Sequence, residues 1–464
     1  MQKDWSRREL LRAMGLISLG GAVPASTWAN IPLVEKTYGD DDVQAAYAKP
    51  ARKITAIVLG AGSRGNVYGN YGLEHPDELD IVGVAEPIPL RNERYAKKHN
   101  IEAQNRFVTW EHVFDVPKFA DAVIITTPDP LHYGPAMRAL EMGYDLLLEK
   151  PIAQSWKECS DILKQAKKHN RIVAVCHVLR YSPYYRKVKE VIDSGVLGKI
   201  ISVQHLEPIQ HVHMSHSYVR GNWRREKDTN PILMAKSCHD LDILRWWIGK
   251  NCNYVSSFGS LSWFRVENAP EGSTARCTDG CAIEATCPYS AVRIYHRERT
   301  WLHHFDLPED KTLQGDAIMK NLKEGPYGRC VYRCDNDVPD HQILAMEFDD
   351  NITVSFSMEA FTNYAGRRTR IMGSMGDIVG DEEDLYVADF RTGEITKWNT
   401  KENSKIKSGH GGGDWGLVRD WLNAIDKQDG SLLTSTLDAS MESHLMAFMA
   451  EKSRHNRTVE KVKL

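Results

Sequence analysis

Three glycines in one short loop are the first residues whose spacing indicates chemistry. The segment 60–65 reads Gly-Ala-Gly-Ser-Arg-Gly and follows the β-branched run 54–59. Between a strand and a helix, the first glycine allows a tight turn, the second lets the backbone approach a pyrophosphate, and the third lets helix and strand pack closely. The helix N-terminus offers amide donors to the phosphates. We therefore predict a dinucleotide site whose loop contacts are Gly60, Gly62, Ser63, Arg64 and Gly65.

An acidic residue at the end of the next strand-like run bears on the choice of dinucleotide. Glu86 follows the run 81–85. An acid in this place accepts hydrogen bonds from both hydroxyls of the adenosine ribose, which favours NAD over NADP. Arg91 lies close behind and is able to meet a 2′-phosphate, so NADP remains an alternative.

Five of the nine cysteines fall within residues 277–334. Cys277, Cys281 and Cys287 are candidate ligands of a structural metal, and Cys330 and Cys334 offer further thiolates. Four thiolates suit tetrahedral zinc, whereas the spacings do not fit the common iron–sulfur patterns. Disulfides, which an exported protein favours, and free thiols are the other two interpretations.

Two histidine-containing segments have less specific patterns. His211, His213 and His216 have a metal-like spacing, but without a clear scaffold a substrate-binding or solvated role is favoured. The segment 410–415, His-Gly-Gly-Gly-Asp-Trp, combines flexibility with polar and aromatic groups, and it fits either a sugar-binding loop or a surface loop.

The order of strand-like and helix-like segments predicts the elements that position these residues. Strand-like runs alternate with amphipathic segments up to about residue 178, which predicts an α/β domain with a doubly wound parallel sheet. Longer alternating strands follow, and 349–351 is expected to form the turn of a hairpin between 342–348 and 352–358. The second domain is therefore expected to be α+β with a large, mainly antiparallel sheet. We place the dinucleotide domain at 53–178 and the second domain at 179–464.

The N-terminus resembles an export signal. Arg7-Arg8 stands before an uncharged stretch, 13–28, and Thr27-Trp28-Ala29 is an acceptable cleavage site. This pattern predicts a twin-arginine signal over 1–29, recognised by the Tat export machinery, and a periplasmic or otherwise exported protein. An ordinary secretory signal is the alternative. Residues 30–52 are polar and are expected to form an exposed arm or to wrap a partner subunit.

Bulk composition excludes several classes of protein. The chain has 464 residues and a net charge of −3, so no basic field points to nucleic acid. After the signal no apolar run is long enough to span a bilayer, and no cysteine stands at the cleavage point to carry a lipid. We therefore expect no membrane anchor.

Three further motifs carry a resemblance to a known family. They are Thr126-Thr127-Pro128 with His132, Glu149-Lys150-Pro151, and His239-Asp240-Leu241-Asp242. Together with the glycine loop, their order resembles the Gfo/Idh/MocA oxidoreductases, which include inositol and glucose–fructose oxidoreductases. The resemblance covers essentially the whole mature chain. It implies a Rossmann domain, a second domain whose open sheet forms dimer or tetramer contacts, and an active site in the cleft between them.

The resemblance also implies roles for individual residues. Lys150 would be catalytic, and His239 would be the general acid/base beside the substrate hydroxyl. The nicotinamide half of the cofactor site would be lined by Thr127, Pro128, His132, Glu149 and Lys150, with His177 from the last Rossmann strand. The chemistry is consistent, because removing a hydride from a carbinol requires a proton acceptor, and a lysine ammonium stabilises charge on the same oxygen.

Two residues near His239 complete the catalytic set. Asp242, three positions later, shares a helix face with His239 and is expected to orient its ring or bind a substrate hydroxyl. Many members of the family carry an aspartate four residues before the histidine, but this chain has Ala235. Either Lys236 replaces the missing acid as a substrate contact, or the chemistry is not plain polyol oxidation.

These observations predict an exported NAD(P)-dependent oxidoreductase that acts on a hydroxyl of a sugar, cyclitol or glycoside. Because free nicotinamide cofactor is scarce outside the cytoplasm, the enzyme is expected to hold its cofactor tightly. Two alternatives remain. One is a redox-neutral NAD-dependent glycosidase that oxidises, eliminates and reduces again. The other is a non-catalytic sugar or nucleotide sensor, against which the presence of both Lys150 and His239 argues.

Overall fold

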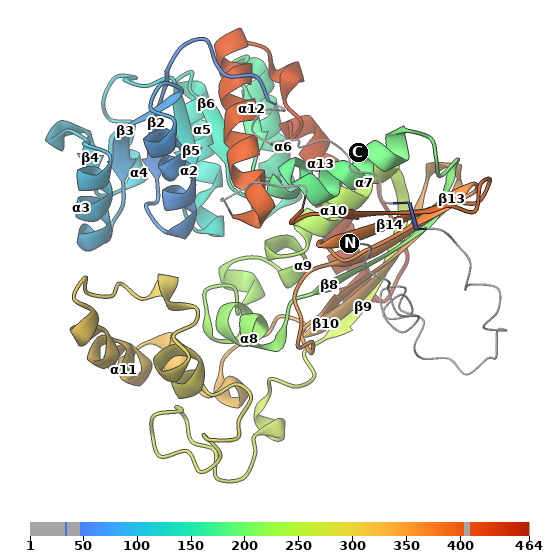
Figure 1. Cartoon of the computed structure of the whole chain (residues 1–464). Coiled ribbons are helices and arrows are strands. Elements are labelled where there is room, and N and C mark those ends of the chain that lie inside the picture. The colour runs from blue at the N-terminus through green and yellow to red at the C-terminus, as the bar shows by residue number, and fades with distance from the viewer. Residues whose placement is uncertain (1–32, 35–46, 403–408, 464) are drawn as a thin grey trace.

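The structure is a computed structural model that describes residues 33–34, 47–402 and 409–463 (Figure 1). Within these residues the chain forms two β-sheets, one with six strands and one with ten. The predicted export signal, and the arm as far as residue 46 apart from Leu33–Val34, lie outside the described residues. No helix among the described residues is long and apolar enough to cross a membrane.

The first sheet is wholly parallel and has the strand order β4-β3-β2-β5-β6-β7. Its central strands are buried on both faces, which explains their continuous apolar sequence. The predicted doubly wound sheet is confirmed. The strands are β2 (Ile54–Leu59), β3 (Leu79–Ala85), β4 (Arg106–Phe107), β5 (Ala122–Ile125), β6 (Asp145–Leu148) and β7 (Val173–Val175). The helices of this domain are α2 (Ser63–Glu74), α3 (Pro89–Lys98), α4 (Trp110–Val113), α5 (Tyr133–Glu141) and α6 (Trp156–Lys168).

The second sheet has the order β1-β15-β14-β13-β12-β8-β11-β10-β9-β16 and is mainly antiparallel. Its parallel pairs are β8 with β11 and β1 with β15. The predicted hairpin is confirmed, since β10 and β11 pair in register around Asp349–Asn351. The strands are β1 (Leu33–Val34), β8 (Ile200–Pro208), β9 (Cys252–Ser260), β10 (His341–Phe348), β11 (Ile352–Glu359), β12 (Arg368–Gly373), β13 (Gly376–Gly380), β14 (Asp384–Asp389), β15 (Ile395–Asn399) and β16 (Glu460–Lys461).

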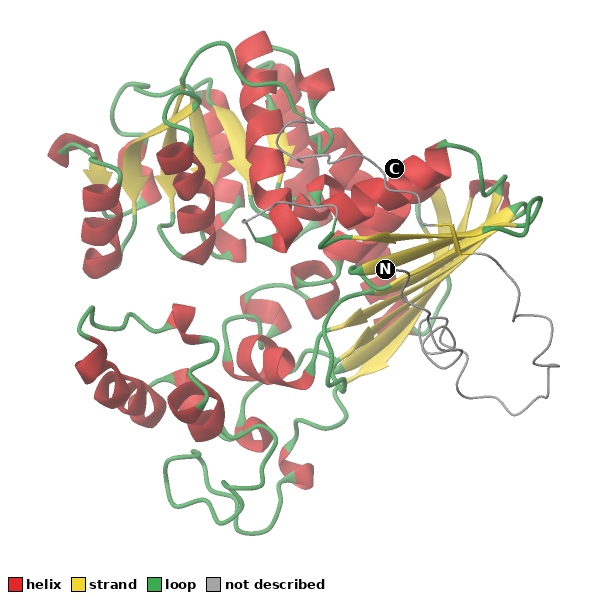
Figure 2. Cartoon of the chain, viewed as in Figure 1, coloured by secondary structure: helices red, strands yellow, loops and turns green. Residues whose placement is uncertain are grey.

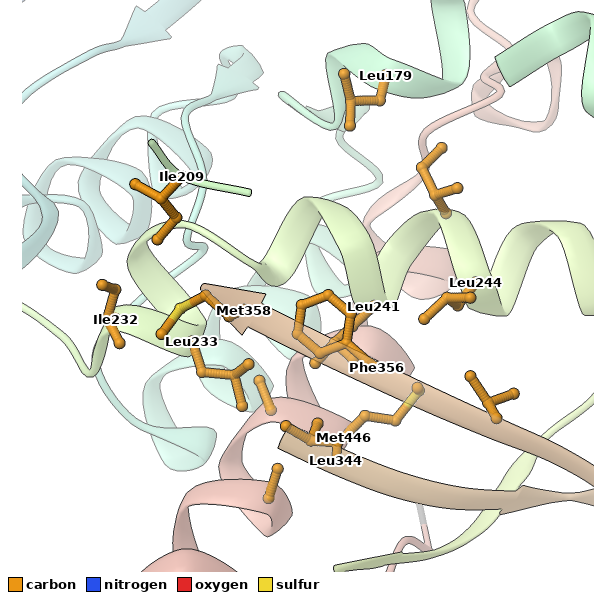
Figure 3. Close-up of a cluster of buried hydrophobic side chains, with 14 of the residues drawn as sticks. Leu179, Ile209, Ile232, Leu233, Leu241, Leu244, Leu344, Phe356, Met358 and Met446 are labelled. Carbon is orange, nitrogen blue, oxygen red and sulfur yellow. The ribbon is translucent and has the colours of Figure 1, made fainter. Parts of the chain in front are cut away.

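One face of the second sheet packs against helices and forms the larger hydrophobic core. The helices are α7 (Pro183–Asp193), α9 (Ile232–Ala235), α10 (Cys238–Ile248) and α13 (Leu437–Asn456). Figure 3 shows Leu241 and Leu244 of α10 beside Phe356 of β11, with Met446 of α13 close by. The period-two pattern of β10 and β11 places alternate side chains in this core.

The helix α12 (Gly413–Lys427) crosses back from the second domain to the first. It packs on α2 and β2, and its Leu417, Val418 and Trp421 belong to the same buried cluster as Val58. Figure 1 shows α12 standing beside the Rossmann elements. The unit that packs around the first sheet therefore includes a segment far beyond the predicted boundary at residue 178.

A long insert separates β9 from β10. It consists of turns, short helices and α11 (Gln314–Glu324) (Figure 2). Its small core includes Ile294, Phe305 and Leu322. The short helix α8 (His211–His213) and the helical segment Met214–Arg220 pack beside it. The insert reaches the Rossmann domain through Asp306, which pairs with Arg91 at 2.8 and 3.0 Å.

Candidate active site

The glycine loop has the shape that a dinucleotide requires. Gly60 has a φ of +93°, and a Cβ there would lie 2.7 Å from the Thr126 carbonyl oxygen. A Cβ on Gly65 would lie 2.2 Å from the Gly60 oxygen, whereas a Cβ on Gly62 would meet nothing within 4 Å. The outer glycines are therefore required by packing, and Gly62 borders open space that a phosphate is able to approach.

The threonine–proline motif is hydrogen-bonded to this loop. The Thr126 hydroxyl donates to the Leu59 and Gly60 carbonyl oxygens at 3.0 and 2.7 Å. The His132 ring is buried and lies 2.9 Å from the Thr127 oxygen and 2.7 Å from the Pro151 oxygen. Since both contacts are to backbone, His132 joins the Thr-Thr-Pro motif to the Glu-Lys-Pro motif, with Pro128 in the turn between.

Glu86 lies where the ribose-binding acid is expected. Its carboxylate accepts from the backbone N–H groups of Ala61 and Ile88 at 2.8 and 3.0 Å. Arg91, the candidate for a 2′-phosphate, is instead held by Asp306 of the insert. The pKa of Arg91 is raised by its hydrogen bond to Asp306.

Arg64 joins the glycine loop to the second domain. Its guanidinium donates to Glu149 at 2.6 Å and to Asp414 at 2.7 Å, and it also contacts the Tyr68 hydroxyl. Although burial opposes ionisation, the charges of Arg64 and Lys150 lower the pKa of Glu149. Asp414 belongs to the loop that we expected to bind sugar or lie on the surface, and here its carboxylate is buried against Arg64. Its role could be found only from the three-dimensional structure.

Lys150 and His239 come together where the Rossmann strands meet α9 and α10. The Lys150 Nζ donates to the Ala235 oxygen at 2.8 Å. His239 lies in the first turn of α10 and is 7% exposed, and its Nδ1 has no hydrogen-bond partner in the part of the chain that the structure describes. Burial, Lys150, His177 and His410 hold the pKa of His239 well below its usual value. The ring is therefore neutral near pH 7 and able to accept a proton.

Asp242 corrects one expectation. It does not orient the His239 ring, because both of its oxygens accept from Arg180 at 2.7 Å. Both side chains are almost fully buried. Without the Asp242 carboxylate, the Arg180 guanidinium would be a buried charge without a counter-ion, which is strongly destabilising. His177 lies behind His239, at ring distances of 5.9 Å from His239 and 5.6 Å from His444, and is completely buried.

Lys236 also has an acidic partner that the sequence did not indicate. Its Nζ lies 3.2 Å from Glu207, which lies next to the last residue of β8, and Glu207 lies 2.7 Å from Arg367. Arg367 in turn pairs with Asp240 at 2.5 Å. An acid therefore lies beside Lys236, although position 235 is alanine. No local pattern marks Glu207 or Arg367, because they come from distant parts of the sequence.

The cysteine window forms one small pocket. It is lined by Cys277, Cys281, Cys287 and Cys330 together with Arg220, and all nine cysteines are free thiols. Among the described residues no three cysteine sulfurs lie within 4.8 Å of one another, so the structure does not support the predicted zinc site at these cysteines. The disulfide interpretation is not observed in this structure. The histidine trio 211, 213 and 216 does not form a metal site either.

Two family models match the chain. Residues 54–177 match the oxidoreductase family with an NAD-binding Rossmann fold, and residues 189–464 match the C-terminal alpha/beta domain of that oxidoreductase family. The chain therefore belongs to the GFO/IDH/MocA family of oxidoreductases, as the motifs indicated. It is an enzyme of this family with an NAD-binding domain.

The chain is similar to curated proteins whose names denote different activities. YteT of Bacillus subtilis, which is named as an oxidoreductase, is 26% identical over 313 residues, covering 65% of this chain and 71% of YteT. The scyllo-inositol 2-dehydrogenase (NAD(+)) of the same organism is 27% identical over 213 residues, covering 45% of this chain and 58% of that enzyme. A 2,7-anhydro-N-acetylneuraminate hydratase of Mediterraneibacter gnavus is 27% identical over 200 residues, covering 41% of this chain and 48% of the hydratase.

Solved structures share the fold. Levoglucosan dehydrogenase in complex with NADH and levoglucosan has a TM-score of 0.65 and 17% identity, covering 89% of this chain and 100% of that chain. An inositol dehydrogenase homolog from Azotobacter vinelandii in complex with NAD⁺ has a TM-score of 0.65 and 14% identity, covering 89% and 99%. At these identities the likeness concerns the architecture.

Proposed function

We propose that this protein is an exported NAD-dependent oxidoreductase that acts on a secondary hydroxyl of a sugar, cyclitol or glycoside. The observation that carries the proposal is the pairing of a neutral, buried His239 with the Lys150 ammonium. The bound NAD would supply the hydride acceptor, and its loop, ribose and nicotinamide contacts would be the residues described above.

The chain's own residues have distinct tasks in this reaction. His239 accepts the hydroxyl proton, because its ring is uncharged near pH 7. Lys150 donates a hydrogen bond to the same oxygen and stabilises the negative charge that develops there. Glu149 stays ionised and holds Arg64 in place, which fixes the glycine loop. Lys236 with Glu207 offers a donor and an acceptor to neighbouring hydroxyls of a polyol.

The choice of NAD over NADP rests on two contacts. In this proposal Glu86 would accept from the ribose hydroxyls, and its negative charge would oppose a 2′-phosphate. Arg91, the nearby cation, is neutralised by Asp306. Export rests on the Arg7-Arg8 pattern, and a protein that leaves the cytoplasm folded is able to take its cofactor with it.

Redox-neutral glycoside cleavage is the second candidate. It is favoured by the relative that is named a hydratase, since that name denotes a reaction without net oxidation. Lys150 and His239 are the candidate bases for this reaction too, because removal of the proton beside a transiently oxidised carbon requires a base.

The deciding experiment uses purified mature protein, added NAD, and a panel of nitrophenyl glycosides and free sugars. NADH absorbance and nitrophenol release are followed together. NADH formation without nitrophenol supports the first proposal, and nitrophenol release without net NADH supports the second. Lys150→Ala is expected to lower turnover at least 100-fold with little change in NAD affinity. Lys157→Ala, a change of an exposed lysine, is the control and is expected to keep wild-type turnover.

Export is tested separately by cell fractionation. The double variant Arg7→Lys, Arg8→Lys is expected to stay in the cytoplasm, whereas the wild type is recovered outside it. Equal distribution of both proteins would contradict the twin-arginine proposal.

A further inference from the structure

Three histidines from two separate segments meet beside the insert. His216 belongs to the helical segment Met214–Arg220, whereas His303 and His304 belong to the short helix Leu302–His304. Each ring provides one nitrogen, and these three nitrogens all lie within 4.8 Å of one another. The separations between ring centroids are 4.1, 4.8 and 6.1 Å.

These separations match what a shared metal ion requires. A zinc–nitrogen bond is about 2.1 Å, so tetrahedral angles place two ligand nitrogens about 3.4 Å apart and their ring centres about 5 Å apart. The three nitrogens, which lie within 4.8 Å of one another, would have to come to about 3.4 Å from one another, so side-chain rotations accompany binding of one ion.

His216 supplies an independent observation. Its side chain is completely buried, its Nδ1 lies 2.8 Å from the Tyr295 hydroxyl, and its Nε2 has no hydrogen-bond partner among the described residues. A buried ring nitrogen without a partner costs free energy. Metal-binding histidines commonly bond one nitrogen to a second group and leave the other for the ion. This arrangement leaves Nε2 of His216 available to a ligand.

We propose that His216, His303 and His304 bind one divalent transition-metal ion, with zinc as the expected ion. Neutral imidazoles suit zinc, copper and nickel. His303 is exposed, so a fourth coordination position is open to water or to a substrate oxygen.

The charges around the site set its expected affinity. Arg220 faces His216 and Arg91 faces His304, and both are cationic. Asp306 neutralises Arg91. Because the ligands bring no negative charge, we expect the ion to bind in micromolar titration and to be lost during purification with a chelator.

The location suggests what the ion does. Binding would fasten the turn 302–304 to the segment 214–220, and the chain continues directly to Asp306, which holds Arg91 of α3. The ion is therefore expected to stabilise the contact between the insert and the Rossmann domain and so to slow release of the dinucleotide. This second step rests on the proposed function, whereas metal binding itself does not.

The test uses full-length, tag-free, metal-depleted protein titrated with Co²⁺ and followed by absorption. Thiolate ligands give strong near-ultraviolet charge-transfer bands, so the cysteine pocket is distinguished from an all-imidazole site. We expect one equivalent of Co²⁺ with visible bands alone, displaced by Zn²⁺. The double variant His303→Ala, His304→Ala should lose that equivalent, and His296→Ala, a change elsewhere in the insert, should keep it. Equal binding by the double variant and the wild type would overturn the site.

The functional step has its own readout. We expect Zn²⁺ to slow NADH release several-fold in the wild type and not in the double variant, as followed by NADH fluorescence in stopped flow. Equal release rates with Zn²⁺ bound would overturn the fastening role. Failure of the wild type to bind NADH would instead count against the proposed function, and the Co²⁺ titration would be unaffected.

Discussion

At the scale of single residues, the glycine loop distinguishes binding from packing. Gly62 borders open space, whereas Gly65 is in contact with the backbone of Gly60. The same change to alanine therefore has different consequences at the two positions.

We expect Gly62→Ala to fold normally and to weaken NAD binding at least 10-fold, about 1.4 kcal/mol, because its methyl group enters the space that a phosphate needs. Gly65→Ala should lower the free energy of unfolding by about 1–3 kcal/mol through overpacking. NAD titration and thermal unfolding of both variants measure the two effects. Unchanged NAD affinity in Gly62→Ala would show that the pyrophosphate does not approach this loop.

The protonation of His239 gives a second prediction. Positive charge on Lys150 disfavours the imidazolium, so Lys150→Met should raise the pKa of His239. His410→Asn should also raise it, because His410 disfavours the imidazolium in the same way. Titration of the His239 ring by NMR measures both shifts without relying on turnover. A downward or absent shift in Lys150→Met would mean that Lys150 does not face this ring.

At the same scale, residue types predicted the participants but not their partners. Lys150 and His239 were identifiable because each lies in a short motif. Their neighbours were not, since Glu207, Arg367 and Asp414 reach the site from distant segments. For Asp242 the helix spacing predicted a position near His239 but not the hydrogen-bond partner. Its carboxylate binds the buried Arg180 instead of the His239 ring.

At the scale of elements, the segments with a regular hydrophobic period could be predicted from the sequence, and those without one could not. The alternation in β10 and β11 and the Asp-Asp-Asn turn specified the hairpin. The insert has short helices and turns without a sustained period, so only its cysteines were visible in the sequence. Its position against α3 depends on single contacts such as the one between Asp306 and Arg91.

That contact predicts cofactor preference. Asp306→Ala should speed NADH release about 2–5-fold, as expected for a partly exposed ion pair of up to about 1 kcal/mol. It should also improve NADPH binding relative to NADH, because Arg91 becomes available to a 2′-phosphate. Release rates and dissociation constants for both nucleotides measure this. Glu309→Ala, an exposed change in the insert, is the control, and an identical effect there would rule out a specific role for Asp306.

At the scale of the whole molecule, Glu226 joins the segment before α9 to the distant helix α13 through Arg454 at 2.7 Å. Burial, with repulsion from Glu451 and Asp337, raises the pKa of Glu226 to about 7. A raised carboxyl pKa means that the folded state favours the protonated form. Stability is therefore lost as pH rises from the unfolded value, about 4.3, through 7.

We expect Glu226→Gln to raise the free energy of unfolding at pH 8 by about 1–2 kcal/mol and to leave it unchanged at pH 4. The glutamine side chain is not charged, yet its amide oxygen is still able to accept from Arg454. Thermal unfolding across this pH range measures the difference. An equal gain at both pH values would indicate a packing effect rather than relief of a buried charge.

The return of α12 to the Rossmann domain has a consequence for the order of events during synthesis. Val58 and Tyr68 are covered partly by residues near 420, and Arg64 finds Asp414 only when that segment has been made. A nascent chain therefore cannot complete its nucleotide-binding half until almost all of it has left the ribosome. The N-terminal half, which would fold first in a simple domain-by-domain sequence, is instead completed among the last. The nucleotide loop remains accessible over most of translation, and docking of α12 closes the fold around it at the end.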